Sequence, residues 1–284
     1  MNSAIIQKVQ GFLSKVSKEG VELDPKLVDE FKEACVASIH KQFNPSSDEW
    51  RPRMSSLGRP LCQQKMERDG VEKAIEYNAI LRFIFGDLVE AISILILKAA
   101  GVNVEEEQKR VKLKLGKNEV NGTLDIIIDD KVWDIKSASP YAFDHKFGEM
   151  GGYKKIKSDD AFGYITQGYL YSESVGKEFG GWIVINKASG EWTVCEAPVV
   201  QDEDRKEFLQ LARKNLNSLV SGEKFKRCFS DTAETYKDEY KQEKKTENKI
   251  GSDAGYDPNN LEHQIGSETD KSLNENIKSF VDNT

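Results

Sequence analysis

Residues 122–139 read GTLDIIIDDKVWDIKSAS. They contain two apolar runs, Ile126–Ile128 and Val132–Ile135, which are separated by the polar pair Asp129–Asp130. β-branched and aromatic residues favour strands, and a polar pair between two such runs indicates a short turn. We therefore expect a β-hairpin here and build the rest of the fold around it.

The length of the turn determines which charged residues meet. If the turn has two residues, Asp125 lies opposite Asp134, and cross-strand neighbours are only ~4.5–5.5 Å apart at Cβ, where like charges are destabilising. A longer turn would change this pairing. Side chains alternate along a strand, so Asp134 and Lys136 share a face in either case. Two carboxylates and an ammonium together predict a divalent cation as their simplest partner.

Helices are indicated before the hairpin. Asp24 and Pro25 suit an N-cap and a first helical position, and apolar residues then recur at helical spacing to about His40. From about Glu72 to Ala100 the pattern is one long helix, or two abutting helices, ending before a glycine.

Glu90 is conspicuous in this long helix. The second half, FGDLVEAISILILKAAG, is apolar on nearly every side and is expected to be buried. Burying an unpaired charge is expensive, so Glu90 needs a partner. Taken alone, a salt bridge to a basic residue explains Glu90 at least as well as a metal site does.

Strands dominate from Val102 to Ser137, and a long loop rich in Gly, aromatic residues and Lys follows. A helix capped by Asp160 then places Gln167 and Tyr171 four residues apart on one face. A second hairpin is expected within residues 182–196, followed by an amphipathic helix. This order of elements predicts an α/β sandwich with a small mixed central sheet flanked by helices.

Two polar segments concentrate basic residues. Residues 51–59 contain three arginines, and residues 153–157 contain three lysines beside Tyr153, a short distance after Phe147. Both segments suit contacts with a nucleic-acid backbone. A solvated loop is the better interpretation of the first segment from charge alone, and an equally good one of the second.

Charge divides the chain unevenly. Residues 231–284 carry 13 Asp or Glu against 7 Lys or Arg, so most of the net charge of −7 belongs to this tail. Its composition predicts a largely disordered segment. We expect a helical N-terminal region over residues 1–50, a core over residues 51–230 and the acidic tail over residues 231–284.

The cellular setting follows from what the chain lacks. Its first residues show no secretory signal, and the longest apolar run, Ala91 to Ala100, is short of the ~20 residues that span a bilayer. We therefore expect a cytoplasmic protein with no membrane partner. Its four cysteines form no C-x-x-C pair and are expected to be buried or free thiols rather than disulfides.

Four segments in order resemble the PD-(D/E)xK nuclease superfamily, and within it the RecB-like exonuclease branch, which includes phage recombination exonucleases and CRISPR adaptation nucleases. They are GDLVE (residues 86–90), GTLD (residues 122–125), DIK (residues 134–136) and QGYLY (residues 167–171). The resemblance covers roughly residues 51–171. D-x-K alone is weak, whereas four segments on the expected element types are specific. The resemblance implies a restriction-endonuclease-like core.

The resemblance also implies a metal centre with Mg²⁺ as cofactor and Mn²⁺ as a substitute. Its ligands would be Glu90, Asp125, Asp134 and the main-chain carbonyl of Ile135, because Mg²⁺ prefers oxygen ligands. The metal would lower the pKa of a bound water. Lys136 would orient or help to deprotonate that water and stabilise the transition state. One or two ions suit three carboxylates.

Gln167 and Tyr171 would position the substrate, by the same resemblance. The alternative interpretation is a pair on a helix surface that packs against the sheet. Iron–sulfur relatives carry four cysteine ligands, and Cys62 and Cys228 suit two of those positions. Residues 250–258 have Ala254 and Asp257 where further cysteines would fall, so no iron–sulfur cluster is expected.

The function expected from the resemblance is a metal-dependent DNA nuclease, an exonuclease rather than an endonuclease, acting in replication, recombination or repair and possibly phage-encoded. A non-catalytic DNA-binding or assembly module on the same fold is the alternative from another class, and a structure-specific or restriction-type endonuclease is the third. DNA is the expected partner. A homo-oligomer and a recombination or single-strand-binding protein are further possible partners.

Overall fold

The computed structural model describes residues 3–44, 50–70 and 77–223. These residues belong to the first of two compact units, Met1–Cys228. The N-terminal region expected over residues 1–50 is therefore part of the same unit as the core. The acidic tail expected over residues 231–284 lies outside the described residues.

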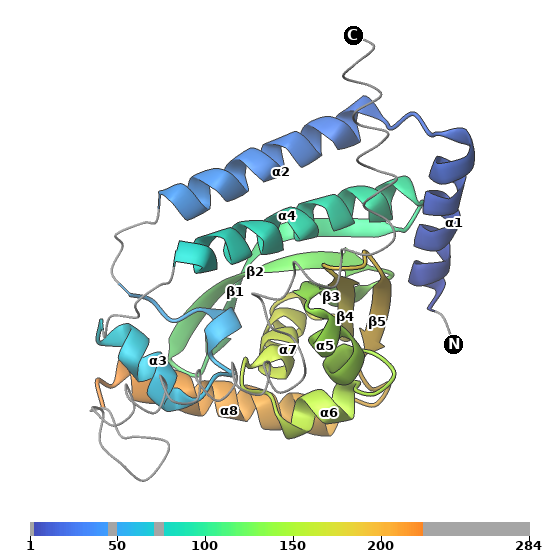
Figure 1. Ribbon diagram of the computed structural model, residues 1–284. Coiled ribbons are helices and arrows are strands. Elements are labelled where there is room, and N and C mark those ends of the chain that lie inside the picture. Colours follow the sequence, from blue (N-terminus) through green and yellow to red (C-terminus); the bar gives the residue numbers. More distant parts are fainter. Residues whose placement is uncertain (1–2, 45–49, 71–76, 224–284) are drawn as a thin grey trace, which may run out of the picture. The chain divides into compact units, whose positions relative to one another are not determined.

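A five-stranded mixed sheet forms the centre of this unit (Figure 1). Its strands follow chain order across the sheet: β1 (Val104–Leu115), β2 (Asn118–Ile128), β3 (Lys131–Ala138), β4 (Glu178–Asn186) and β5 (Trp192–Glu196). Neighbours are antiparallel except β3 and β4, which run parallel. Parallel neighbours need a crossover, and the chain from residue 139 to residue 177 supplies it.

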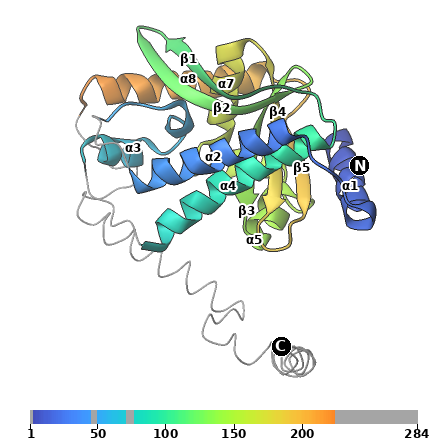
Figure 2. The ribbon, with the colours of Figure 1, turned by 90° about the horizontal axis from the view of Figure 1, so that it is seen from above.

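Helices cover both faces of the sheet, which confirms the predicted α/β sandwich (Figures 1 and 2). On one face α4 (Tyr77–Ala99) lies between the sheet and α2 (Pro25–Phe43), with α1 (Ala4–Glu19) packed beside α4. On the other face lie α7 (Tyr164–Val175) and α8 (Asp202–Val220). Because both faces are buried, Ile126, Ile127 and Ile128 can form an unbroken apolar run.

The turn between β2 and β3 has two residues, the shorter of the lengths that the sequence left open. Asp129 and Asp130 adopt φ of 49° and 63°, the left-handed region that this type of turn requires and that Asp tolerates. The register pairs Ile126 with Trp133 and Ile128 with Lys131. Local turn chemistry is therefore sufficient to set this register.

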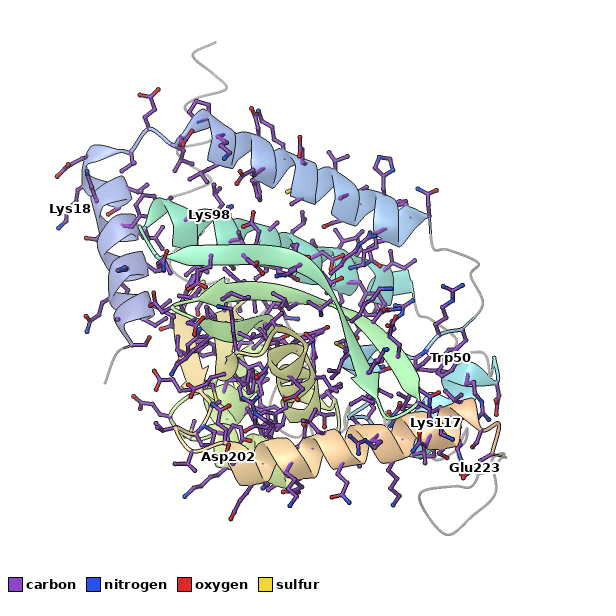
Figure 3. The ribbon with its side chains drawn as sticks, turned by 180° about the vertical axis from the view of Figure 1, so that it is seen from behind. Lys18, Trp50, Lys98, Lys117, Asp202 and Glu223 are labelled. Atoms are coloured by element: carbon purple, nitrogen blue, oxygen red, sulfur yellow. The ribbon has the colours of Figure 1, made fainter. Side chains whose placement is uncertain are left out.

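Long side chains join the layers of the α4 face. The ammonium of Lys98, labelled in Figure 3, lies 2.8 Å from the Glu30 carboxylate of α2 and 2.6 Å from the Glu107 carboxylate of β1. The helix α4 ends at Ala99, and Gly101 adopts φ of 71°, as expected for a residue just past a helix. The expected start of this helix, near Glu72, lies outside the described residues.

The segment expected as a long loop after β3 is largely helical. It contains α5 (Pro140–Ala142), the π-helix η2 (Phe143–Phe147) and α6 (Tyr153–Ser158). Phe147 and Tyr153 are buried in the core, so neither of the two interpretations left open, a nucleic-acid contact or a flexible surface loop, holds for these rings. Lys157 forms ion pairs with two carboxylates of α8. Tertiary packing, which the local pattern does not reveal, orders this segment.

The connection around residues 51–59 is also more structured than expected. It contains a short 3-10 helix, η1 (Met54–Ser56), followed by α3 (Leu61–Arg68), and Arg53 forms an isolated β-bridge with Asn121.

The thiols of Cys35 and Cys195 are free, whereas Cys62 is in a disulfide, so the expectation of free thiols is wrong for Cys62. Within the described ranges, every helix is too short or too polar to cross a bilayer.

Candidate active site

The hairpin brings Asp125 and Asp134 together without making them a ladder pair. The β2–β3 register ends at Ile126 and Trp133, and β3 continues by pairing with β4. Beyond that point the Ile135 N–H donates to Asp125 Oδ2 at 2.8 Å. The Asp125 carboxylate thus takes the place of the backbone carbonyl that would accept this N–H in a continued ladder. The hydrogen bond holds the carboxylate against the backbone of β3.

Asp134 is the most enclosed carboxylate of the cluster, with 2% of its surface exposed. Its Oδ2 lies 2.7 Å from the Lys136 ammonium, which strand alternation places on the same face. Its Oδ1 accepts a 3.0 Å hydrogen bond from Gln167 Nε2 of α7. Each oxygen of Asp134 therefore has a partner that the sequence pattern had singled out.

Glu90 reaches the cluster from α4, which packs against β3. Its carboxylate accepts a hydrogen bond from the Gln108 side chain of β1. No ion pair of Glu90 is found among the described residues, so the salt-bridge alternative is not realised there. Burial raises the pKa of Glu90 to about 7, with Lys136 lowering it and Asp134 raising it, so Glu90 interacts electrostatically with both.

Gln108 occupies an unusual backbone position. It adopts φ of 46° inside β1, between residues that pair on either side of Asp125. Such a conformation is uncommon for a residue other than Gly and costs of order 1–3 kcal/mol. The register of β1 against β2 is the same on either side of Gln108, and the Gln108 side chain reaches Glu90. No periodic pattern in the sequence predicts it.

Tyr171 connects the helix α7 to the start of the GTLD segment. It is 4% exposed, and a Cβ added at Gly122 would lie 2.6 Å from Tyr171 Cε1. Burial raises the pKa of the Tyr171 phenol, and Asp125 and Asp134 raise it further, so the hydroxyl stays neutral. The ring requires a glycine opposite it, which explains why Gly122 precedes the hairpin.

The electrostatics of the cluster are those of crowded carboxylates around one cation. Burial, with Glu90 and Asp134 nearby, raises the pKa of Asp125 well above its usual value. Burial alone would lower the pKa of Lys136, but Asp134 and Asp125 outweigh it and raise that pKa. Lys136 therefore holds its proton firmly, and the carboxylates bear a mutual repulsion that another cation would relieve.

The donor set is suited to a hard dication, because it consists of oxygen ligands. Over the described ranges, no three His, Cys, Asp or Glu side chains are already gathered as a metal-binding group. Glu90 is engaged by Gln108, and the Lys136 ammonium lies against Asp134. The chemistry of the residues fits a cation, whose binding would draw Glu90 towards Asp125 and Asp134.

Three further residues beside the cluster were not predicted. The Lys136 ammonium lies 5.2 Å from the centre of the Tyr164 ring, and Lys146 and Phe162 contact the same ring. A signal for Tyr164 was present, because it lies three residues before Gln167 and so shares its helix face. Lys146 and Phe162 lie on other segments, and only the tertiary fold brings them here.

Five chains of solved structures are similar to this one, among them the following two. The protein SSO0001 shares 16% sequence identity with a TM-score of 0.42, and the match covers 69% of this chain and 88% of that one. An Eubacterium rectale protein named "Putative exonuclease" shares 13% identity with a TM-score of 0.35, covering 74% of this chain and 91% of that one. No family model and no curated protein matches the chain. Identities and TM-scores this low do not indicate an activity, so a function must be inferred from the residues of the site.

Proposed function

We propose that this protein is a metal-dependent DNA nuclease that hydrolyses phosphodiester bonds, most simply as an exonuclease. The observation that carries the proposal is the contact set of Asp134, whose two oxygens meet the Lys136 ammonium at 2.7 Å and the Gln167 amide at 3.0 Å. Asp125 accepts a hydrogen bond from the Ile135 N–H. The segments GTLD, DIK and QGYLY are therefore joined by direct contacts between their side chains and backbone. Their joint placement supports a shared chemical role.

The proposed cofactor is Mg²⁺, with Mn²⁺ as a substitute. Asp125, Asp134 and Glu90 would hold it together with the main-chain carbonyl of Ile135. When bound, such an ion lowers the pKa of a coordinated water and offsets negative charge on a phosphate. The raised pKa values of Asp125 and Glu90 support this assignment, since they report carboxylates that lack a sufficient counter-charge.

Lys136 is proposed to act as a cationic hydrogen-bond donor. Asp134 and Asp125 raise its pKa, so Nζ keeps its proton at neutral pH and is a poor base. From its place beside Asp134, the ammonium would orient the attacking water and stabilise the charge that develops on the phosphate oxygens. Removing one such preorganised donor typically costs ~10²–10³ in rate.

Gln167 and Tyr171 are proposed to hold the site in register. Gln167 is 8% exposed and gives its amide N–H to Asp134, and Tyr171 is buried against Gly122. Gln167 therefore acts directly on a carboxylate, whereas Tyr171 packs against the strand that carries Asp125. From these positions beside Asp134 and Gly122, the two side chains would also help to place the substrate.

DNA as substrate, and cutting from ends, are the finer parts of the proposal, and the resemblance of the four segments supports them. We also propose a role in replication or recombination, a homo-oligomeric state and a single-strand-binding partner protein. The alternative is a non-catalytic DNA-binding module, which would bind DNA without cutting it.

The test is a digest of end-labelled linear DNA and closed circular DNA with Mg²⁺, with Mn²⁺ or with EDTA. The wild type should degrade linear DNA only with a metal, and Lys136→Ala should be slower by about 100-fold or more. Lys131→Ala is the matched control, because Lys131 is on the same strand but pairs with the exposed Glu178 at 3.5 Å. It should cut at the wild-type rate.

Each other outcome has a separate meaning. Absence of metal-dependent cleavage by the wild type, or full activity in Lys136→Ala, would refute the proposed chemistry. Cleavage of closed circles would replace the exonuclease with an endonuclease while leaving the site assignment in place. Equal loss in Lys136→Ala and Lys131→Ala would indicate damage to the hairpin rather than to catalysis.

A further inference from the structure

An exposed aromatic ring is held next to the candidate active site. Phe162 lies in the turn before α7, with 55% of its surface exposed. It stacks on Tyr164 with ring centroids 5.4 Å apart and planes inclined by 17°. One face of Phe162 is therefore covered by Tyr164, and a large part of the ring remains open to solvent.

The turn that carries Phe162 is fixed by close backbone contact. A Cβ added at Gly58 would lie 2.6 Å from Gly163 Cα, and Gly163 adopts φ of 73°. Asp160 accepts hydrogen bonds from the Tyr164 and Ile165 N–H groups at 2.8 and 2.9 Å. An exposed ring on such an anchored turn is already ordered, so it pays little entropy when it binds a ligand.

Lys146 supplies a positive charge at the same place. Its ammonium lies 5.0 Å from the centre of the Phe162 ring and 4.8 Å from that of Tyr164. Lys146 is half-buried. Among the described residues it forms no ion pair, although the carboxylates of Asp160 and Asp159 lie close enough to act on it electrostatically. A partly desolvated cation without an ion pair favours an anionic ligand.

Tyr164 links this pair to the candidate catalytic lysine. Lys136 and Lys146 both lie about 5 Å from the centre of the Tyr164 ring. A ligand that lies on Phe162 and pairs with Lys146 therefore lies next to the phosphate that Lys136 would contact. Neighbouring nucleotides of one strand would supply both a base for Phe162 and phosphates for the two lysines.

We propose that Phe162 and Lys146, backed by Tyr164, form a nucleotide subsite in which an unpaired base stacks on the open face of Phe162 and its phosphate pairs with Lys146. The inference rests on the proposed nuclease function and names the form of its substrate. Aromatic rings combined with cations are the general means of binding single strands. Both faces of a base inside a duplex are already stacked, so the subsite selects a single-stranded or frayed end.

Stacking is tested by oligonucleotides that carry a terminal 2-aminopurine, with matched abasic ends, in EDTA so that nothing is cut. The wild type should alter the 2-aminopurine fluorescence and bind the base-bearing end about tenfold more tightly than the abasic end. Phe162→Ala should lose both effects, and Phe162→Trp should keep them. Phe43→Ala, which removes a phenylalanine 68% exposed on α2, should match the wild type.

The phosphate contact is tested by the salt dependence of binding. Each phosphate contact on a single strand contributes about 0.7 to the slope of log affinity against log salt. Lys146→Gln should lower that slope by about 0.7, whereas Phe162→Ala should leave it unchanged. Thermal unfolding of each variant verifies that it is folded, and Lys146→Arg should restore the slope if only charge is needed.

The outcomes separate this inference from the proposed function. If the wild type cuts DNA and Phe162→Ala binds both ends as the wild type does, the subsite is wrong and the nuclease stands. If the wild type cuts nothing but shows base-dependent binding through Phe162, the subsite stands and the nuclease falls. A wild type that binds no oligonucleotide overturns the subsite.

Discussion

One hydrogen bond fixes the Asp125 carboxylate, while burial and two neighbouring carboxylates make its charge unfavourable. Its Oδ2 accepts the Ile135 N–H at 2.8 Å, which fixes the carboxylate, while burial, Glu90 and Asp134 raise its pKa. A charged residue in such a position lowers the stability of the folded state, and functional sites commonly carry such a cost. The arrangement makes sense if a cation is the missing partner.

Asp125→Asn should therefore stabilise the metal-free protein. Asn keeps an oxygen for the Ile135 N–H and removes the charge that Glu90 and Asp134 repel, so a gain of about 1 kcal/mol, or ~2–4 °C in Tm, is expected. In Mg²⁺ the wild type should gain stability, because the ion binds only the folded state, and the variant should gain little. Thermal unfolding with EDTA and with Mg²⁺ measures both effects. A variant less stable than the wild type in EDTA would contradict this account.

Some contacts of single residues at the site were predictable from the sequence, and others were not. The contact between Asp134 and Lys136 follows from strand alternation, and the hairpin register follows from two aspartates that tolerate a left-handed turn. The partner of Glu90 does not follow, because Gln108 reaches it through an irregularity in β1 at positive φ.

At the scale of elements, the four matched segments correspond to contacts between helices and strands. Gly122 of β2 packs against Tyr171 of α7, and Asp134 of β3 accepts from Gln167 of the same helix. The helix α7 therefore sets the positions of both strands at the site. Its place in the fold was predictable from helical spacing, whereas η2 and α6 were not, because buried Phe147 and Tyr153 order them.

Gly122→Ala tests this contact between β2 and α7. The added Cβ would lie 2.6 Å from Tyr171 Cε1 and 3.0 Å from Met54 Sδ, and both side chains are buried and cannot withdraw. A loss of ~1–3 kcal/mol and a reduced cleavage rate are expected. Gly11→Ala in α1 is the control, since nothing lies within 4 Å of its Cβ, and it should stabilise by ~0.5–1 kcal/mol. Denaturant unfolding measures both, and an unaffected Gly122→Ala would refute the close packing.

Asp204 joins α8 to α6 and gives a pH dependence. Burial opposes its charge, but hydrogen bonds from Lys157 at 2.7 Å and from the Tyr153 hydroxyl at 2.7 Å outweigh burial and lower its pKa. A lowered pKa in the folded state stabilises at pH values above the unfolded pKa of ~3.9, and this contribution is lost as pH falls through the folded value.

Asp204→Asn should accordingly cost about 1 kcal/mol at pH 7, and the difference from the wild type should shrink below about pH 4. Urea unfolding at several pH values measures the difference. Glu207→Gln is the control, because Glu207 pairs with the same Lys157 but is 59% exposed, and it should cost less. A deficit of Asp204→Asn that stays constant down to pH 3 would show that the charge is not what stabilises the contact.

At the scale of the whole unit, the candidate site lies where two helical layers meet one sheet. Glu90 comes from the α4 layer, Asp125 and Asp134 from the sheet, and Gln167 from the α7 layer. The fold class was predictable because the alternation of helices and strands leaves few ways to bury both faces. Phe162 and Lys146 were not, since their meeting depends on the crossover between β3 and β4.

At this scale, metal binding and cleavage are expected to depend on different residues. Lys136 lies 2.7 Å from Asp134 Oδ2 and competes with a cation for that oxygen, whereas Asp134 is a proposed ligand. Removing the ammonium should therefore free the site for a metal and still slow the chemistry. Removing the carboxylate should abolish both.

Isothermal titration of Mn²⁺ into DNA-free protein, with cleavage assayed on the same preparations, tests this most directly because no contaminating nuclease can imitate the binding. The wild type should bind Mn²⁺ and cut, Lys136→Ala should bind at least as tightly but cut about 100-fold more slowly or worse, and Asp134→Asn should do neither. A wild type that binds no Mn²⁺, or Asp134→Asn that binds it as the wild type does, would contradict the metal centre.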